Sequence, residues 1–202
     1  YNSNGTQITG TYGTITFGAD GSYTYTADQS AATAMEAGQT ETDVFVYEIT
    51  DSSGGTTTAT LTITVTGVND APTALNDFGA INEGATLTVS DGDNKNASGA
   101  IDATGEHSGD VIHTSSSSNQ DTDPDVNPTL TVSEIRKGNV EGSGDAGTVG
   151  QSLSGTYGAL TINANGSYTY IANSDITGLY SGDSRTESVS YTHLTLPTTT
   201  IV

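Results

Sequence analysis

The sequence predicts an all-β protein that contains two tandem copies of one thin, two-layer domain. The segment GTYGTITFGADGSYTY at residues 10–25 aligns without gaps with GTYGALTINANGSYTY at residues 155–170, and eleven of the sixteen positions are identical. The offset of 145 residues is far longer than the period of a solenoid, so the repeated unit is a whole domain. Only 32% of the residues are hydrophobic, which favours thin β layers over a large enzyme core.

Strict alternation of apolar and polar residues predicts the clearest strand. In TATLTITVTG at residues 58–67, the threonines fall on one face, and the other face carries Ala59, Leu61, Ile63 and Val65. We therefore expect one face in the core and the other in water. DVFVYEIT at residues 43–50 predicts the preceding strand, and DSSGG at residues 51–55 supplies the turn between them.

The repeated segment itself predicts a hairpin. GTYGTITF and SYTYTA are strand-like, and ADG lies between them, where Asp20 and Gly21 tolerate positive φ. Asn165 and Gly166 take the same positions in the second copy.

Each copy carries two tyrosines on one face of this hairpin, at positions Tyr23 and Tyr25 and at positions Tyr168 and Tyr170. We expect them to pack within the domain, and the alternative is a platform that binds a ligand.

The remaining segments are less regular. SAATAMEAG at residues 30–38 predicts one or two helical turns that begin at an N-cap Ser30, and its counterpart in the second copy is SDITGLYSG at residues 174–182. Residues 90–119 are rich in Ser, Gly, Asn and Asp and predict a long loop. Its short apolar pairs, at residues 100–101 and 111–112, are candidate edge strands.

Two histidines of this loop lie near acidic residues in the sequence. His107 and His113 are close to Glu106 and Asp110, which suggests zinc, but the spacing fits no zinc motif. They are therefore predicted to be solvated loop residues.

The charge balance limits the classes of partner that the protein is expected to bind. There are 24 acidic and 4 basic residues and a formal net charge of −20. Such a surface repels nucleic-acid phosphates and anionic membranes, so no nucleic-acid binding is expected. Hard divalent cations, chiefly Ca²⁺, are the natural partners of many carboxylates, and the alternative is that the charge only keeps the surface soluble.

The sequence also lacks cysteine, an apolar membrane span and a visible signal peptide. The chain has no Cys, so disulfides and thiolate metal sites are excluded. No apolar segment approaches the roughly 20 residues of a membrane span, so membrane insertion is not expected. No signal peptide is visible and Tyr1 begins within a strand-like pattern, which indicates a fragment of a longer protein.

These motifs together resemble a known family. GTYGTITFGADGSYTY, followed by GQTETDVFVYEITDSSGGTTTATLTITVTGVNDAP at residues 38–72, resembles the VCBS repeat, a bacterial cadherin-like domain found in tandem in very large surface proteins. The resemblance covers about residues 9–72 and 130–191. It implies immunoglobulin-like or cadherin-like Greek-key β-sandwiches, both incomplete here, in a giant RTX-type adhesin that a type I system exports.

The resemblance also divides the chain. Residues 1–68 are predicted to be the C-terminal part of a first repeat, 69–76 a linker, and 77–191 a second repeat with a long loop at about 90–119. Residues 192–202 are predicted to be a non-native tail, because SYTHLTLPTTTIV resembles translated adapter sequence. The last strand of the second repeat is then missing or replaced, an unpaired and poorly ordered edge is expected, and His193 is expected to have no functional role.

A candidate calcium site lies between the copies. Asp121, Asp123 and Asp125 alternate along the chain, so their carboxylates converge on one side of an extended backbone that Pro124 stiffens. This is not an EF-hand loop, because the sixth position is Val126 and the twelfth is Val132.

Further ligands are therefore required. Similarity to cadherins implies Asn69 and Asp70 in the linker and Glu83 early in the second repeat. The alternative is an Asp-rich turn that holds its own amides.

The predicted function is that of a repeat in a large secreted or surface-attached bacterial adhesin. Calcium would stiffen the junction between neighbouring repeats, so that the repeats act as spacers in cell adhesion or biofilm formation. One alternative is a module that binds polysaccharide or a host surface, and another is an accessory domain of a secreted hydrolase. No enzymatic activity is expected, because SGDSR at residues 181–185 aligns with a loop and no other catalytic motif is present.

Overall fold

The structure is a computed structural model that describes residues 5–92, 106–107, 109–113, 120–126, 129–140 and 142–196, without the side chains of 106–107 and 194–196. The chain divides into two compact units. Unit 1 comprises Tyr1–Ala71, Pro124–Pro128 and Pro197–Val202, and unit 2 comprises Pro72–Asp123 and Thr129–Leu196. The described residues form antiparallel strands and one short helix, so the predicted all-β class is confirmed.

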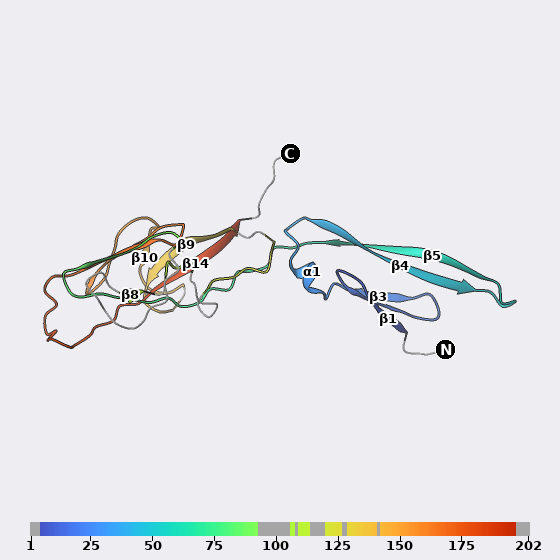
Figure 1. Cartoon of the computed structure of the whole chain (residues 1–202), viewed down its shortest axis with the longest axis horizontal. Coiled ribbons are helices and arrows are strands. Elements are labelled where there is room, and N and C mark those ends of the chain that lie inside the picture. Colours follow the sequence, from blue (N-terminus) through green and yellow to red (C-terminus); the bar gives the residue numbers. More distant parts are fainter. Residues whose placement is uncertain are drawn as a thin grey trace, which may run out of the picture. The chain divides into compact units, whose positions relative to one another are not determined.

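Unit 1 contains two sheets. One has the strand order β1-β2-β3, and the other is the long hairpin of β4 and β5 (Figure 1). The strands are β1 (Thr6–Thr9), β2 (Thr14–Phe17), β3 (Tyr23–Thr26), β4 (Thr40–Thr50) and β5 (Thr56–Thr66).

The alternation predicted for β5 is confirmed. Its threonines are exposed, while Ala59, Leu61, Ile63 and Val65 are half-buried or buried. Aromatic contacts join the two sheets, because the rings of Tyr25 and Phe45 lie 6.2 Å apart and those of Phe17 and Tyr47 lie 6.1 Å apart. The core of unit 1 therefore lies between its two sheets, with Ile15, Met35 and Phe45 buried.

The predicted helix exists but is shorter than expected. α1 spans only Ser30–Thr33, and its N-cap is Gln29 rather than Ser30. The counterpart in unit 2, residues 174–182, forms turns instead of a helix. Glycines with positive φ at Gly178 (79°) and Gly182 (93°) lie in these turns, and this conformation does not continue a helix.

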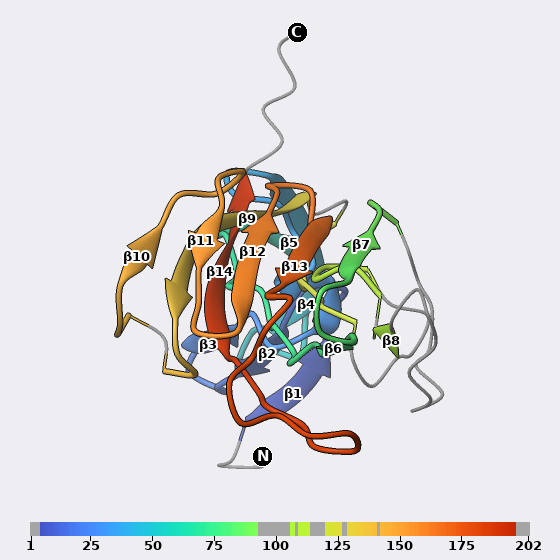
Figure 2. The same ribbon diagram turned by 90° about the vertical axis from the view of Figure 1, so that its left-hand side faces the viewer.

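Unit 2 contains two larger sheets and one small pair. The first sheet has the order β11-β12-β13-β7, the second has the order β10-β9-β14, and β6 pairs with β8. Figure 2 shows β11, β12 and β13 side by side, with β7 beyond β13. The strands are β6 (Gly79–Ala80), β7 (Thr86–Val89), β8 (Glu106–His107), β9 (Thr129–Lys137), β10 (Ala146–Gly147), β11 (Leu153–Ser154), β12 (Gly158–Ile162), β13 (Tyr168–Ala172) and β14 (Val189–Leu196).

The core of unit 2 lies between its two larger sheets. Leu87 and Val89 from β7, Ile162 from β12 and Tyr168 from β13 form one buried cluster with residues of β9, among them Ile135. This arrangement of two facing antiparallel sheets is a β-sandwich.

One segment of the core differs from the prediction. Val111 and Ile112 are buried members of the core and not an edge strand. The Val111 N–H donates to the Gly166 carbonyl at 3.1 Å, so this segment is held against the β12–β13 turn rather than against a strand. The other predicted edge strand, at residues 100–101, lies outside the described residues.

The repeated hairpin is confirmed in both units. Gly18 N–H donates to Ser22 O at 2.8 Å in unit 1, and Asn163 N–H donates to Ser167 O at 2.9 Å in unit 2. Positive φ occurs at the glycine of each turn. Residues 10–13 of the first segment and 155–157 of the second form a turn rather than a strand, and Gly158 begins β12.

Candidate functional site

The segment at residues 121–123 lies beside the linker in unit 2. Thr122 and Thr73 form an antiparallel bridge, with N–O distances of 2.7 and 3.0 Å. Asp121 is 4% exposed, and its Oδ1 accepts a hydrogen bond from the Leu75 N–H at 2.7 Å. Thr122 therefore fixes the backbone of Thr73, and the predicted ligand Asp121 fixes that of Leu75.

The second oxygen of Asp121 faces His193. Asp121 Oδ2 lies 3.1 Å from His193 Nε2, and both side chains are almost fully buried. Burial raises the pKa of Asp121 to about 7, with a further contribution from the charge of Asp77, and burial lowers the pKa of His193. Both directions favour the neutral forms of the two side chains, because charged groups are costly in an apolar interior.

Tyr191 completes this cluster. Its hydroxyl donates to the Leu75 carbonyl at 3.1 Å and makes a short contact with Asp77 Oδ2. Its ring lies 5.2 Å from the His193 ring. Burial and the Asp77 carboxylate raise the pKa of Tyr191 above its usual range. Asp77, Asp121, Tyr191 and His193 are called the junction cluster below. His193 was expected to have no role, yet it lies at the centre of this cluster.

The other predicted ligands lie in different surroundings. Asp125 belongs to unit 1 and is half-buried, and its Oδ2 accepts a hydrogen bond from the Asp70 N–H at 3.3 Å. Asn69 is exposed and donates through Nδ2 to the Asp70 carbonyl at 2.6 Å. Asp123 is half-buried in unit 2, and Glu83 is exposed in the turn before β7. The six residues thus form two sets, Asn69, Asp70 and Asp125 in unit 1 and Glu83, Asp121 and Asp123 in unit 2.

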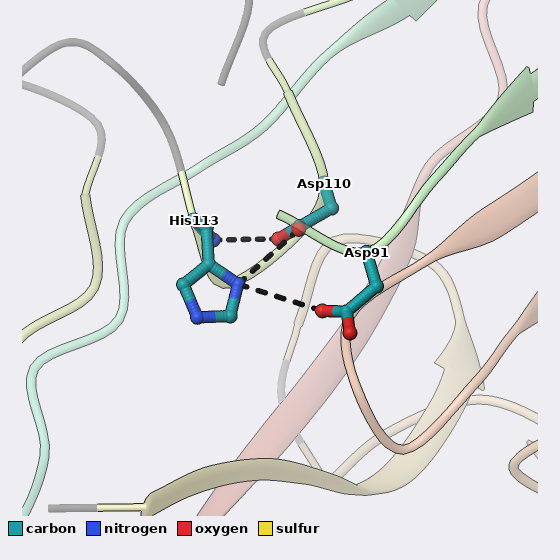
Figure 3. A group of neighbouring side chains, drawn as sticks. All are labelled: Asp91, Asp110 and His113. Atoms are coloured by element: carbon teal, nitrogen blue, oxygen red, sulfur yellow. Dashed lines mark hydrogen bonds and ion pairs between the residues drawn. The ribbon is translucent and has the colours of Figure 1, made fainter. Parts of the chain in front are cut away.

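A second group of possible ligands surrounds Asp110. Oxygen and nitrogen atoms of Asp91, Asp110 and His113 lie within 4.8 Å of one another (Figure 3). His113 Nδ1 is 3.2 Å from Asp110 Oδ2 and 4.0 Å from Asp91 Oδ1.

The Asp110 carboxylate nevertheless already accepts hydrogen bonds from backbone N–H groups. It is fully buried and accepts hydrogen bonds from the N–H groups of Gly92, Ile112 and His113 at 2.6, 2.8 and 2.5 Å. Asp110 therefore holds a tight loop against the core, and the expectation of a solvated residue is wrong. His113 is exposed as expected, and the side chains of Glu106 and His107 lie outside the described residues.

Each unit also uses one carboxylate that the sequence did not single out. Asp43 accepts hydrogen bonds from the N–H groups of residues 11–13 at 2.8 to 3.1 Å and from the Tyr25 hydroxyl at 2.8 Å. In unit 2, Glu187 accepts from the Thr156 N–H in a short contact and from the Tyr170 hydroxyl at 2.8 Å. The second tyrosine of each hairpin therefore orients an acid that caps the GTYG turn, which confirms packing for Tyr25 and Tyr170.

An open groove crosses unit 2, with a volume of about 1720 Å³. Its lining includes polar and aromatic side chains, among them Asn82, Glu83, Tyr157, Tyr180 and Arg185. Tyr180 is 77% exposed. An exposed aromatic ring beside hydrogen-bonding groups can contact both an apolar face and polar groups of one ligand.

No helix among the described residues is long and apolar enough to span a membrane.

Comparison with known proteins supports a binding or structural module. A calcium-binding lectin of Rhizobium johnstonii, RapA2, is 29% identical over 191 residues, which cover 94% of this chain and 68% of the lectin. Residues 2–67 match the family model of the bacterial cadherin-like domain. The predicted resemblance is thereby confirmed, and the facing antiparallel sheets agree with it.

Proposed function

We propose that this chain is a calcium-binding repeat of a large secreted or surface-attached bacterial adhesin, and that it acts as a spacer. The observation that carries the proposal is the acidic run Asp121, Asp123 and Asp125. Asp121 is buried, and the charge of nearby Asp77 adds to the rise of its pKa, so a bound cation would stabilise the ionised carboxylate. The cationic side chains Arg136 and Lys137 pair elsewhere, with Glu134 and Asp145.

The chemistry of these ligands suits calcium. Ca²⁺ takes six to eight oxygen ligands from carboxylates, backbone carbonyls and amide side chains. Unit 2 contains the candidates Asp121, Asp123 and Glu83, and unit 1 contains a separate set of candidates, Asn69, Asp70 and Asp125. Similarity to a calcium-binding lectin supports calcium binding by this chain.

Mechanically, calcium would restrain the linker. Thr73 is already held by Thr122, and Leu75 by Asp121 and Tyr191. A cation on the neighbouring carboxylates would remove their mutual repulsion. VCBS-type or RTX-type architecture, export by a type I system and a role in biofilms are parts of this proposal that rest on the sequence resemblance.

Calorimetry tests the calcium assignment. The whole chain, freed of metal, is titrated with CaCl₂, and we expect a dissociation constant of about 10⁻⁴ to 10⁻³ M, as for extracellular modules. Asp121→Asn and Asp70→Asn should each weaken binding about tenfold or more, whereas Glu48→Gln, at an exposed position of β4, should not. Equal binding by all variants would reject these residues as ligands.

Small-angle scattering tests the spacer role. Addition of Ca²⁺ should increase the maximum dimension of the chain and narrow its distribution of distances, and a chelator should reverse both changes. Calcium binding without any change in these distances would reject stiffening while leaving the metal site in place.

A second candidate function is carbohydrate binding. The groove of unit 2 with the exposed Tyr180 favours it, and the similar protein RapA2 is a lectin. Glycan-array binding with and without Ca²⁺ tests it directly. Tyr180→Ala should abolish the signal, and Tyr23→Ala, at another exposed tyrosine, should leave it unchanged.

A further inference from the structure

Three side chains that can ligate a metal converge in unit 2, apart from the junction cluster. They are Asp91, in the turn after β7, and Asp110 and His113, and one ligand atom of each lies within 4.8 Å of the other two. Figure 3 shows the His113 imidazole with its Nδ1 directed at both carboxylates. Asp91 precedes Asp110 by 19 positions, so the fold brings this group together and no local motif reports it.

The hydrogen bonds of Asp110 leave one of its oxygens with capacity for a further partner. Oδ1 accepts from the N–H groups of Ile112 and His113 at 2.8 and 2.5 Å, which uses both of its lone pairs. Oδ2 accepts from the Gly92 N–H at 2.6 Å and lies 3.2 Å from His113 Nδ1. Carboxylates that ligate metals are themselves hydrogen-bonded, because those bonds hold the oxygen in one orientation. Asp110 is therefore a fixed ligand at the base of the group.

The charges of the group favour a cation. Two carboxylates face a single imidazole, and the basic side chains of the described residues make their contacts elsewhere. Like charges at this separation repel, so a divalent ion between the two carboxylates would relieve their repulsion more fully than the imidazole alone.

The distances and the ligand types suit zinc. Tetrahedral Zn²⁺ holds nitrogen and oxygen ligands at about 2.0–2.2 Å, which places neighbouring ligand atoms about 3.3 Å apart. Asp110 Oδ2 and His113 Nδ1 already match this spacing at 3.2 Å. Asp91 Oδ1 lies 4.0 Å from Nδ1, and its side chain is 56% exposed, so rotation of that side chain can close the gap without disturbing the core. Ca²⁺ prefers oxygen alone, so the imidazole selects a transition metal.

We propose that Asp91, Asp110 and His113 form a zinc site. Nδ1 of the histidine and one oxygen of each carboxylate bind the ion, and the fourth tetrahedral position is left to water. The ion connects the turn after β7 to residues 110–113, and so closes the intervening chain in a protein that has no Cys to do so. The site shares no ligand with the proposed calcium site.

Isothermal titration with ZnCl₂ tests the site. The whole chain is kept in excess CaCl₂, which competes for the proposed calcium ligands, and one equivalent of Zn²⁺ should bind. His113→Ala and Asp91→Asn should each weaken binding about tenfold or more, since loss of an outer partner alone costs that much. The matched controls are His107→Ala, at the other histidine of the same loop, and Asp70→Asn, at a proposed calcium ligand, and both should bind zinc as the wild type does.

The imidazole ¹⁵N signals of His113 provide a second measurement. Zinc on Nδ1 requires the tautomer that carries its proton on Nε2, so Zn²⁺ should shift the Nδ1 signal much more than the Nε2 signal. Three results would overturn the proposal: no zinc binding in CaCl₂, equal losses in His107→Ala and His113→Ala, or a larger shift at Nε2 than at Nδ1. A chain that binds zinc in this way but fails to bind calcium would reject the proposed function and leave the zinc site in place.

Discussion

At the scale of single residues, carboxylates in this chain act mainly on the backbone. Asp43, Asp110 and Glu187 each accept hydrogen bonds from main-chain N–H groups of a turn. Burial raises the pKa of Asp43, but the hydrogen bonds from Tyr25 and from residues 11–13 outweigh it, and the net pKa is lowered. The ionised form of Asp43 therefore stabilises the folded state of unit 1.

Replacement of Asp43 should destabilise unit 1. Asp43→Asn removes charge from an acceptor of four hydrogen bonds, so we expect a loss of about 1–3 kcal/mol in the free energy of unfolding. Tyr25→Phe should cost a similar amount. Glu48→Gln, exposed on β4, should stay within about 0.5 kcal/mol. Denaturant unfolding measures these differences, and an Asp43→Asn chain as stable as Glu48→Gln would contradict this account.

The same carboxylate predicts a pH dependence. The pKa of Asp43 in the folded state lies below its ordinary value of 3.8. Its stabilising contribution is therefore complete above that value and is lost as the pH falls through the lower folded value. The difference in unfolding free energy between wild type and Asp43→Asn should be constant from neutral pH to about pH 5 and should shrink below pH 3.8. A difference that persists undiminished at about pH 2 would show that Asp43 acts without its charge.

At the scale of elements, strand register decides which side chains matter. β4 and β5 pair with Phe45 opposite Leu61 and with Val46 opposite Thr60. Phe45 is 5% exposed, whereas its neighbour Val46 is 63% exposed. Adjacent residues of one strand thus lie on opposite faces of the hairpin, as the period of two requires.

Substitutions at these neighbours should differ sharply. Phe45→Ala removes a buried ring that contacts Tyr25 and should cost about 3–5 kcal/mol. Val46→Thr matches the threonine-rich exposed face and should change the free energy of unfolding by less than about 0.5 kcal/mol. The same substitution should lower the tendency to aggregate, because it removes exposed apolar surface from a long hairpin. Chemical unfolding and light scattering measure the two effects, and comparable losses of stability would mean that the register is different.

The sequence predicted elements better than it predicted contacts between them. β5 follows from its alternation, and the hairpin turns follow from Asp-Gly and Asn-Gly, because both signals are local. Val111 and Ile112 did not form the predicted strand, because the Val111 N–H binds the Gly166 carbonyl and the Ile112 N–H binds Asp110, and no local pattern reports those partners. Asp121 was found as part of an acidic run, but its contact with His193 joins residues 72 positions apart and required the fold.

At the scale of the whole molecule, the surplus of negative charge dominates. With 24 acidic and 4 basic residues, most carboxylates have no cationic side chain to pair with. Self-repulsion of this kind destabilises a compact state, and salt weakens it over distances beyond the Debye length of about 8 Å at physiological ionic strength. Monovalent salt should therefore raise the unfolding temperature of both units through general screening.

Calcium should do more than screen. If Ca²⁺ binds specifically to carboxylates of the native state, it raises the free energy of unfolding. The increase grows with the logarithm of the Ca²⁺ concentration and is about 2.7 kcal/mol at one hundred times the dissociation constant. Calorimetric unfolding in CaCl₂ and in NaCl of equal ionic strength separates the two effects. We expect a higher unfolding temperature in CaCl₂, and we expect Asp121→Asn to remove that excess while keeping the response to NaCl.

MgCl₂ should stabilise less than CaCl₂, because Mg²⁺ demands octahedral geometry and gives up its water reluctantly. Equal unfolding temperatures in all three salts would reduce the role of the acidic surface to solubility alone.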